Sequence, residues 1–486
     1  MYPNFKTKPF EHQLQALGCS WDKTNFAYFM EMGTGKSKVL IDNIAMLYDR
    51  KEINSAVVIA PKGVYRNWEK QELPIHLPDH IQTRITTWVA PSSRNKEDKK
   101  VMDNLSKSFD GLDIFLMNIE ALSSKPAAEY LARYLNSTNS LLAVDESTTI
   151  KSNTAGRTKN VLKAAKFAKY RRILTGSPVT KNPMDLYTQC QFLDEDLLGF
   201  SSYWAFKSRY AIEVKRHMSS HSFSHVVGFR NLDELSRKLS AFSYRVLKED
   251  CLDLPPKIYT KRVIELTPEQ QRAYNDLSTF AITELNKEQV SVTNSVTLLL
   301  RLHQIACGYL ASDDGPLQPL KNNRMTELLD VLEETEGKVI IWANYRYNIF
   351  DIEKELKKKY GEETVATYFG DTKDSDRQDI VKAFQDPDNP IRFFVGNQQT
   401  GGYGLTLTQA HTVIYYSNNY DLEKRIQSED RAHRIGQKNN VTYVDIICEK
   451  TVDENIVNSL RGKIDLASQS LGEKLKEWLI ESRKKK

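Results

Sequence analysis

Three short stretches carry residue types that together could bind a nucleoside triphosphate and cleave its terminal phosphate. The first, MEMGTGKS from Met30 to Ser37, joins an apolar strand pattern to an amphipathic helix pattern. A strand, a glycine loop, a lysine, a hydroxyl and a helix follow one another in this order in phosphate-binding loops. Met30 stands where that pattern has its first glycine, but the strand before the loop and the helix after it compensate. We therefore predict that this loop binds the phosphates of ATP.

Each residue of this loop has an expected role. Gly33 and Gly35 allow backbone N–H groups to face the phosphates, and Thr34 lies between them in the same cradle. Lys36 would neutralise the β- and γ-phosphates, and Ser37 would ligate Mg²⁺. The alternative is an ordinary loop of this composition.

A carboxylate pair follows a second apolar run, in LLAVDESTTIKS from Leu141 to Ser152. Asp145 and Glu146 stand at the end of that predicted strand. In a chain that already holds a phosphate loop, the pair indicates one carboxylate that orients Mg²⁺ and one base for the attacking water. The alternative is an acidic cap for the next helix.

The third stretch is QSEDRAHRIGQ, from Gln427 to Gln437. Arg431 and Arg434 are three residues apart, so both could point the same way from one helical turn. Guanidinium groups need an anion to clamp, and the phosphates expected at Met30–Ser37 supply one. We therefore predict that the fold brings the two stretches together around one ATP.

Bulk composition is that of an ordinary globular protein. The 486 residues are 40% hydrophobic and 27% charged, enough for two or three cores. The net charge of +5 is too small to indicate nucleic acid by itself, so any such surface must be local. Basic residues cluster in KAAKFAKYRR (Lys163 to Arg172), KELKKK (Lys354 to Lys359) and RKKK (Arg483 to Lys486). A solvated helix face remains the alternative for each cluster.

The sequence gives little support for a metal-binding protein, a disulfide-bonded protein or a membrane protein. The five cysteines are scattered without a C-x-x-C pair, which argues against a disulfide framework or a structural zinc site and suits a reducing interior. His217, His221 and His225 recur every four residues, but the serines between them weaken a helix, so an exposed polar loop is expected. No apolar run approaches the ~20 residues of a membrane span. We expect no signal peptide and an intracellular, cytoplasmic protein.

The order of strand and helix patterns predicts the fold class. Strands and helices alternate up to Leu193 and again in the C-terminal half, which predicts an α/β fold with two parallel sheets. Helical patterns dominate between them. We expect five segments: 1–193, the ATP-binding lobe; 194–253, a helical insertion and the end of that lobe; 254–320, a linker and helical insertion; 321–460, the second lobe; and 461–486, a C-terminal helix and basic tail.

As a set, these motifs resemble the Swi/Snf-type branch of the superfamily-two helicase-like ATPases. The resemblance rests on MGTGKS, APKGVYRNWEK, DES, LTGSP, GGYGLTL and QSEDRAHRIGQ in this order, preceded by the helical segment PFEHQLQAL with Gln13. It covers roughly Pro9 to Val457. Ser147-Thr148, Ser177 and Thr406 depart from the residues commoner in that family.

The resemblance implies two RecA-like lobes with helical insertions, the fold of a P-loop NTPase, and ATP with Mg²⁺ in the cleft between them. It implies that Gln13 reads adenine, although a surface glutamine is the commoner fate of such a residue. Arg431 and Arg434 would be arginine fingers, with Gln427 lining the same cleft. Gly402 and Gly404 would couple ATP to nucleic acid.

The resemblance also implies a monomeric translocase on double-stranded DNA that acts on DNA-bound proteins. The compactness of the chain favours a motor from a bacterium or from a virus-infected cell. A location in the nucleus is the alternative. The rivals are a strand-separating helicase on DNA forks or RNA and a clamp that uses ATP only as a switch. The candidate nucleic-acid contacts follow predicted strands: Lys62, Asn67, Asn118, Asn344 and Thr400.

Overall fold

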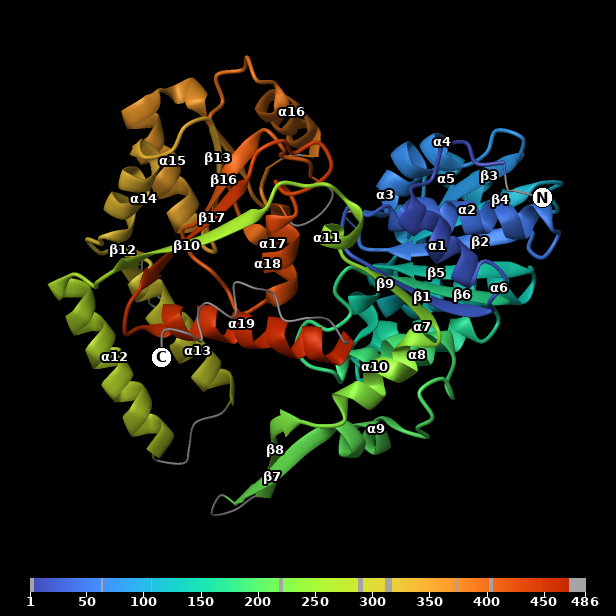
Figure 1. Cartoon of the computed structure of the whole chain (residues 1–486), viewed down its shortest axis with the longest axis horizontal. Helices are drawn as coiled ribbons and strands as arrows, with labels where there is room; N and C mark the ends of the chain where they lie inside the picture. The colour runs from blue at the N-terminus through green and yellow to red at the C-terminus, as the bar shows by residue number, and fades with distance from the viewer. Residues whose placement is uncertain are drawn as a thin grey trace. The chain divides into compact units, whose positions relative to one another are not determined.

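The structure is a computed structural model in which the chain folds as two compact units. It describes residues 4–62, 64–105, 107–217, 222–286, 292–310, 317–372, 374–401 and 405–471, with the side chains at 216–217, 222–223, 280–286, 292–296, 374–375 and 400–401 left aside. Unit 1 is Met1–Asp253 with the end of the chain from Lys463, and unit 2 is Leu254–Gly462. In Figure 1 the first part of unit 1, up to Asp253, runs from blue to green, unit 2 runs from yellow-green to red, and the segment from Lys463 that belongs to unit 1 is red.

Unit 1 is built on a sheet of seven strands in the order β3-β4-β2-β5-β6-β1-β9, and every neighbouring pair is parallel. Its strands are β1 (Asn25–Met30), β2 (Ser55–Ala60), β3 (Thr83–Thr87), β4 (Leu112–Asn118), β5 (Ser140–Asp145), β6 (Tyr170–Leu174) and β9 (Ser243–Val246). The central strands are buried along their whole length, as expected for parallel strands covered on both faces. Their carboxyl ends therefore share one edge, where loops can gather side chains.

Helices cover both faces of this sheet (Figure 1). The helices of unit 1 are α1 (Glu11–Ser20), α2 (Lys36–Asp49), α3 (Tyr65–Asn67), α4 (Leu73–His76), α5 (Lys96–Asn104), α6 (Lys125–Asn136), α7 (Gly156–Ala165), α8 (Asp185–Leu193), α9 (Tyr203–Tyr210), α10 (Leu232–Ser240) and α11 (Lys248–Cys251). Apolar residues of α1, α2 and α4 form one core with the sheet, and those of α6 to α10 form the other.

Unit 2 has a six-stranded sheet in the order β10-β17-β16-β13-β15-β14, again with parallel pairs only. The strands are β10 (Lys257–Ile264), β13 (Lys338–Trp342), β14 (Val365–Tyr368), β15 (Phe393–Gly396), β16 (Ala410–Tyr415) and β17 (Val441–Cys448), beside the short pair β11 (Tyr309–Leu310) and β12 (Gln318–Pro319). The helices are α12 (Pro268–Asn286), α13 (Val292–Ala306), α14 (Arg324–Glu333), α15 (Arg346–Tyr360), α16 (Asp374–Gln385), α17 (Gln398–Gly401), α18 (Leu422–Glu429) and α19 (Val452–Leu471). The prediction of two parallel α/β sheets is confirmed.

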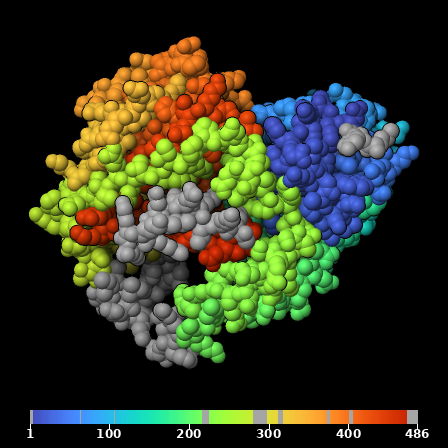
Figure 2. All heavy atoms as spheres, in the orientation of Figure 1, coloured from blue at the N-terminus to red at the C-terminus, as the bar shows by residue number. Residues whose placement is uncertain are grey.

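The structure of unit 1 corrects one sequence expectation and one of the alternatives left open. The stretch around His217 and His225, expected to be a polar loop, forms an antiparallel hairpin of β7 (Ala211–His217) and β8 (Ser222–Phe229). Its β-branched valines favour extended backbone over a loop. The hairpin stands at the surface of unit 1 (Figures 1 and 2). His221 lies outside the described residues, and among those described no cluster of three or more metal-ligating side chains occurs.

The second correction concerns Arg172, the last residue of the basic run for which a solvated helix face was the alternative; that alternative is wrong for this residue, which lies in β6. Its side chain is fully buried, and its guanidinium donates to the carbonyl oxygens of Ser20, Lys23 and Thr24 and to Asn43 Oδ1. Arg172 therefore fixes the end of α1 against the sheet, and with it the helix that carries Gln13. The division into insertions at 194–253 and 254–320 stays a prediction. Within the described residues, every helix is too short or too polar to span a lipid bilayer.

Candidate nucleotide and nucleic-acid sites

The phosphate loop of unit 1 has the backbone shape that its glycines predict. Gly33 has φ +80° and Gly35 has φ +85°, a region that glycine enters without strain. The loop leads directly into α2, whose first residues are Lys36 and Ser37. A helix N-terminus with glycine amides before it is an anion site in its own right. The loop residues therefore suit the phosphates of a nucleotide.

Gln13 and His12 hold this loop from α1. Gln13 Nε2 and His12 Nε2 both lie within hydrogen-bond distance of the Thr34 carbonyl oxygen, at 3.0 and 2.8 Å. Gln13 Oε1 accepts from the Phe10 amide at 3.0 Å. Only 4% of Gln13 is exposed, so the surface-glutamine alternative is wrong. A Cβ on Gly35 would lie 2.1 Å from Gln13 Nε2, which explains why this position needs glycine. Contact with adenine stays a prediction.

The side chain of Lys36 lies against the start of its own loop. Its ammonium donates to the Glu31 carbonyl oxygen at 3.4 Å, and 8% of the residue is exposed. Thr34 Oγ1 donates to the same carbonyl at 2.7 Å. The loop therefore keeps the positive charge of Lys36 beside its glycines.

Asp145 is the last residue of β5 and is 6% exposed. Burial raises the pKa of its carboxyl, while the nearby Lys36 ammonium and a hydrogen bond from Trp68 work against that rise. Trp68 Nε1 donates to Asp145 Oδ2 at 3.0 Å, and the Glu146 amide donates to Oδ1 at 3.0 Å. Each carboxylate oxygen has a second lone pair, so this donor set still fits Mg²⁺, a cation that prefers oxygen ligands.

Glu146 adopts φ +50°, an unusual conformation for a residue with a Cβ. It precedes the 3₁₀ turn Ser147–Ile150 and makes no side-chain capping bond to that turn, which contradicts the acidic-cap alternative. Backbone strain of this kind persists where surrounding structure enforces it, and it concentrates at functional sites.

Gln189, a residue that sequence reasoning missed, links the carboxylate turn to the TGSP turn. Ser147 Oγ donates to Gln189 Oε1 at 2.7 Å, and Gln189 Nε2 donates to the Pro178 and Asp185 carbonyl oxygens at 2.8 and 2.7 Å. Gln189 is fully buried on α8. Ser147, a departure from the family pattern, thus has a structural use here. Neither Trp68 nor Gln189 could have been found from spacing, because both contacts join distant parts of the chain.

In unit 2, the two arginines of QSEDRAHRIGQ converge, but the expected helical turn is wrong, because α18 ends at Glu429 and both arginines lie in the turn that follows. Arg431 Nη1 and Arg434 Nη1 both donate to the Leu405 carbonyl oxygen, at 3.2 and 3.0 Å. Arg431 Nε also donates to the Gln427 carbonyl oxygen at 2.8 Å. Arg431 is 2% exposed and Gln427 is 4% exposed, whereas Arg434 is half-buried. The pair forms one cationic group at the end of α18. Gly402 and Gly404 lie outside the described residues.

The rest of this stretch serves structure. Gln437 Nε2 donates to the carbonyl oxygens of Thr408, Ala410 and Ala432. Glu429 accepts from Arg425 Nε at 2.9 Å and from Tyr259 at 2.7 Å. Burial alone would raise the pKa of Glu429, but Lys257 and Arg425 hold it at about 2. These contacts fix the turn that carries the two arginines.

The candidate nucleic-acid residues of unit 1 lie at the carboxyl edge of its sheet. Asn118 ends β4, and Lys62 and Asn67 follow β2. Ala60 pairs with Asn118 across these two strands. Lys62 is exposed and Asn67 is half-buried. The three residues are therefore grouped, as predicted from their positions after strands.

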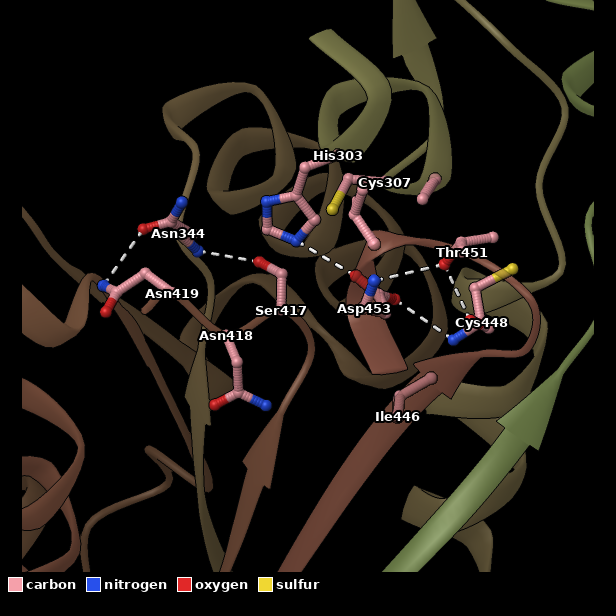
Figure 3. A network of polar contacts seen from close by, with 12 residues as sticks. His303, Cys307, Asn344, Ser417, Asn418, Asn419, Ile446, Cys448, Thr451 and Asp453 are labelled. Atoms are coloured by element: carbon pink, nitrogen blue, oxygen red, sulfur yellow. Dashed lines mark hydrogen bonds and ion pairs between the residues drawn. The ribbon is translucent and has the colours of Figure 1, made fainter. Parts of the chain in front are cut away.

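In unit 2, Asn344 follows β13, where Figure 3 shows it close to Ser417 and Asn419. Ser417 Oγ accepts from the Asn344 amide at 2.8 Å, and Asn419 Nδ2 donates to Asn344 Oδ1 at 3.4 Å. Thr400 lies in α17, after the neighbouring strand β15, and its side chain is outside the described set. Asn344 and Thr400 thus follow adjacent strands of one sheet.

A buried charge network supports the Asn344 loop from beneath (Figure 3). The neighbouring residue, Tyr345, places its hydroxyl 2.7 Å from His303 Nδ1, and His303 Nε2 lies 3.1 Å from Asp453 Oδ1. Arg324 pairs with the same carboxylate. Burial alone would lower the pKa of His303, but Cys307 and Asp453 beside the ring raise it to about 10. The network joins α13, α14 and α19 to the loop after β13.

Comparisons with known proteins assign the family. The sequence matches the SNF2-related domain over residues 22–309 and the helicase conserved C-terminal domain over residues 320–436. The chain belongs to the SNF2 family. Its two units are the RecA-like lobes of that family's ATPase core, and membership implies ATP hydrolysis, typically with Mg²⁺.

The relatives are distant and longer. An uncharacterised ATP-dependent helicase of Mycoplasma pneumoniae is 26% identical over 450 residues, which cover 91% of this chain and 40% of that protein. Transcription regulatory protein SNF2 of Saccharomyces cerevisiae is 24% identical over 459 residues, covering 90% of this chain and 26% of that protein. The solved SWI2/SNF2 ATPase core of Sulfolobus solfataricus in complex with double-stranded DNA is 25% identical, with a TM-score of 0.43 and coverage of 96% and 93%. This chain therefore spans less than half of either curated relative.

The buried histidine generates a prediction about unit 2. Because its folded pKa of about 10 lies above the ordinary 6.5, charged His303 stabilises the fold fully below about pH 6.5. That contribution is lost as pH rises toward 10. His303→Gln should therefore destabilise the protein most at pH 6, and the gap from wild type should narrow at pH 8 and further at pH 10. Urea unfolding at the three pH values measures it. A gap that widens with pH would contradict the assignment.

Proposed function

We propose that this chain is an ATP-dependent translocase that moves along double-stranded DNA and can act on proteins bound to it. The main support is the order of loops at the carboxyl edge of the unit 1 sheet. Across β4, β2, β5, β6 and β1, that edge carries the predicted DNA contacts, then Asp145 and Glu146, then the TGSP turn, then the phosphate loop. Duplex contacts and ATP chemistry therefore adjoin within one rigid sheet.

In the proposed reaction, the backbone amides of Gly33 to Gly35 and the Lys36 ammonium bind the β- and γ-phosphates. Ser37 and Asp145 would hold Mg²⁺, which would neutralise charge on the phosphates when bound. Glu146 would orient the attacking water and accept its proton. Gln13 would contact the adenine.

Arg431 and Arg434 of unit 2 would complete the site by stabilising charge on the transferred phosphoryl group. We propose that ATP favours the state in which the arginines reach it, and that hydrolysis removes this preference. Only such a difference in affinity between two states can convert binding energy into motion of one lobe against the other. Alternating affinity for duplex phosphates would then give movement along the DNA.

DNA contacts are proposed at Lys62, Asn67 and Asn118 in unit 1 and at Asn344 and Thr400 in unit 2. Such contacts reach phosphates, so binding should tolerate any sequence and weaken with salt. We place the protein inside the cell, in the compartment that holds the DNA, and we propose that it acts as a monomer.

The first test concerns the arginines. Arg434→Ala removes the proposed charge on the transition state, so turnover should fall by about 10³ to 10⁵. Affinity for ATP should stay within a few fold, because the phosphate loop is untouched. Steady-state ATPase rates and binding of a fluorescent ATP analogue measure the two quantities. Arg272→Ala, an exposed arginine on α12, is the matched control and should change neither. If turnover of Arg434→Ala stays within a few fold of wild type, Arg434 is not an arginine finger.

The second test separates the translocase from its rivals. ATPase rates are measured with duplex DNA, single-stranded DNA, RNA and no nucleic acid, at two salt concentrations. We expect duplex DNA to give the largest stimulation and higher salt to reduce it. Stimulation by single strands or RNA alone would favour a strand-separating helicase. A rate that no nucleic acid changes would favour an ATP-switched clamp and would exclude the translocase.

A further inference from the structure

Trp68 lies between two sites to which the proposed function gives different tasks. It directly follows Asn67, a proposed DNA contact, and its indole N–H donates to Asp145 Oδ2 at 3.0 Å. Trp68 and Asp145 are 77 positions apart in sequence, and Trp68 is 1% exposed. A hydrogen bond from a buried neutral donor to a buried carboxylate is among the stronger kinds in proteins.

The order of strands in the sheet explains how this contact could link the proposed DNA contacts to Asp145. Strand β2 lies between β4 and β5, and the segment that follows β2 contains both Lys62 and Trp68. Asn118 ends β4 on one side, and Asp145 ends β5 on the other. The segment after β2 therefore adjoins the proposed DNA contact of one neighbouring strand and the proposed magnesium ligand of the other.

The local backbone around Trp68 is irregular. A π-helical segment, η1 (Trp68–Glu72), separates α3 from α4, and the Leu73 amide donates to the Trp68 carbonyl oxygen five residues before it. Glu69 of this segment accepts from Thr87 Oγ1 at 3.0 Å. Single π turns within α-helices are rare and occur often at functional sites. Conversion of the π turn to an α turn would change the register by one residue, about 100° of rotation, and would move the indole relative to Asp145.

We propose that Trp68 is a positioning residue that couples duplex binding at Lys62–Asn67 to the Asp145 carboxylate. The inference rests on the proposed function and adds the route by which DNA would raise the rate of hydrolysis. DNA phosphates contacting the residues before Trp68 favour one register of the segment from Tyr65 to His76. In that register, the indole N–H holds Asp145 Oδ2 and directs the remaining lone pairs of the carboxylate toward Mg²⁺.

The test removes the indole N–H and keeps the aromatic volume. Trp68→Phe is the simple variant, and 3-benzothienylalanine at position 68 replaces the N–H by sulfur with almost no change of shape. Duplex-stimulated kcat should fall roughly tenfold or more, as expected for loss of a hydrogen bond to a charged group. The ratio of rates with and without duplex DNA should fall toward one. The Mg²⁺ concentration for half-maximal rate should rise, while KM for ATP should change little.

Trp88→Phe is the matched control. Trp88 is another buried tryptophan of unit 1, and its ring lies 5.2 Å from that of Tyr130 in the opposite core. It should leave the stimulation ratio and the Mg²⁺ requirement unchanged. Thermal unfolding of all variants reports whether they fold, and the benzothienyl variant decides the question if Trp68→Phe does not.

The outcomes separate the inference from the proposed function. If duplex DNA stimulates the wild type and the benzothienyl variant keeps the same stimulation ratio, Trp68 does not couple the sites and the inference is wrong. A parallel fall of both rates at constant ratio also overturns it, because the indole would then hold Asp145 regardless of DNA. If duplex DNA does not stimulate the wild type, the proposed function fails and the inference falls with it.

Discussion

The candidate site of unit 1 depends on what surrounds one carboxyl group, that of Asp145, where water is largely excluded. Asp145 is 6% exposed, and burial by itself favours its protonated form. The Lys36 ammonium, the Trp68 indole and the Glu146 amide oppose that tendency. These three groups come from the loops after β1, β2 and β5, and only a parallel sheet brings such loops to one edge. The fold can therefore be understood as the support for one buried carboxyl group, one ammonium group and two neutral N–H donors.

In unit 2 the requirement is different, because two guanidinium groups of like charge are held close together. Arg431 and Arg434 share the Leu405 carbonyl oxygen, a neutral acceptor that orients both guanidinium groups. Glu429, by contrast, pairs with Arg425 of the same helix, α18, and with Lys257 of β10. The residues around this turn therefore pair Glu429 with two cations and bring the guanidinium groups of Arg431 and Arg434 to one acceptor.

Much of this could be predicted from sequence because the signals are local. The glycines at 33 and 35, the alternation of strands and helices, and the spacing of Arg431 and Arg434 each concern residues near one another in the chain. The contacts of Trp68 with Asp145 and of Ser147 with Gln189 span 77 and 42 residues and arise only from strand order. The β7–β8 hairpin was missed because serines and histidines obscured its valines, and Arg172 because a basic run does not reveal which side chain is buried.

The central claim is that one ATP is shared by both units and draws on Lys36 from one and Arg434 from the other. Energy transfer between dyes attached through unnatural amino acids at Arg133 of unit 1 and Arg272 of unit 2, both exposed, tests it most directly. A non-hydrolysable ATP analogue with Mg²⁺ should change the transfer efficiency in the wild-type protein, and ADP should not. The change should disappear in Arg434→Ala although the analogue still binds. An efficiency that the analogue leaves unchanged, or that changes equally in Arg434→Ala, would contradict the account.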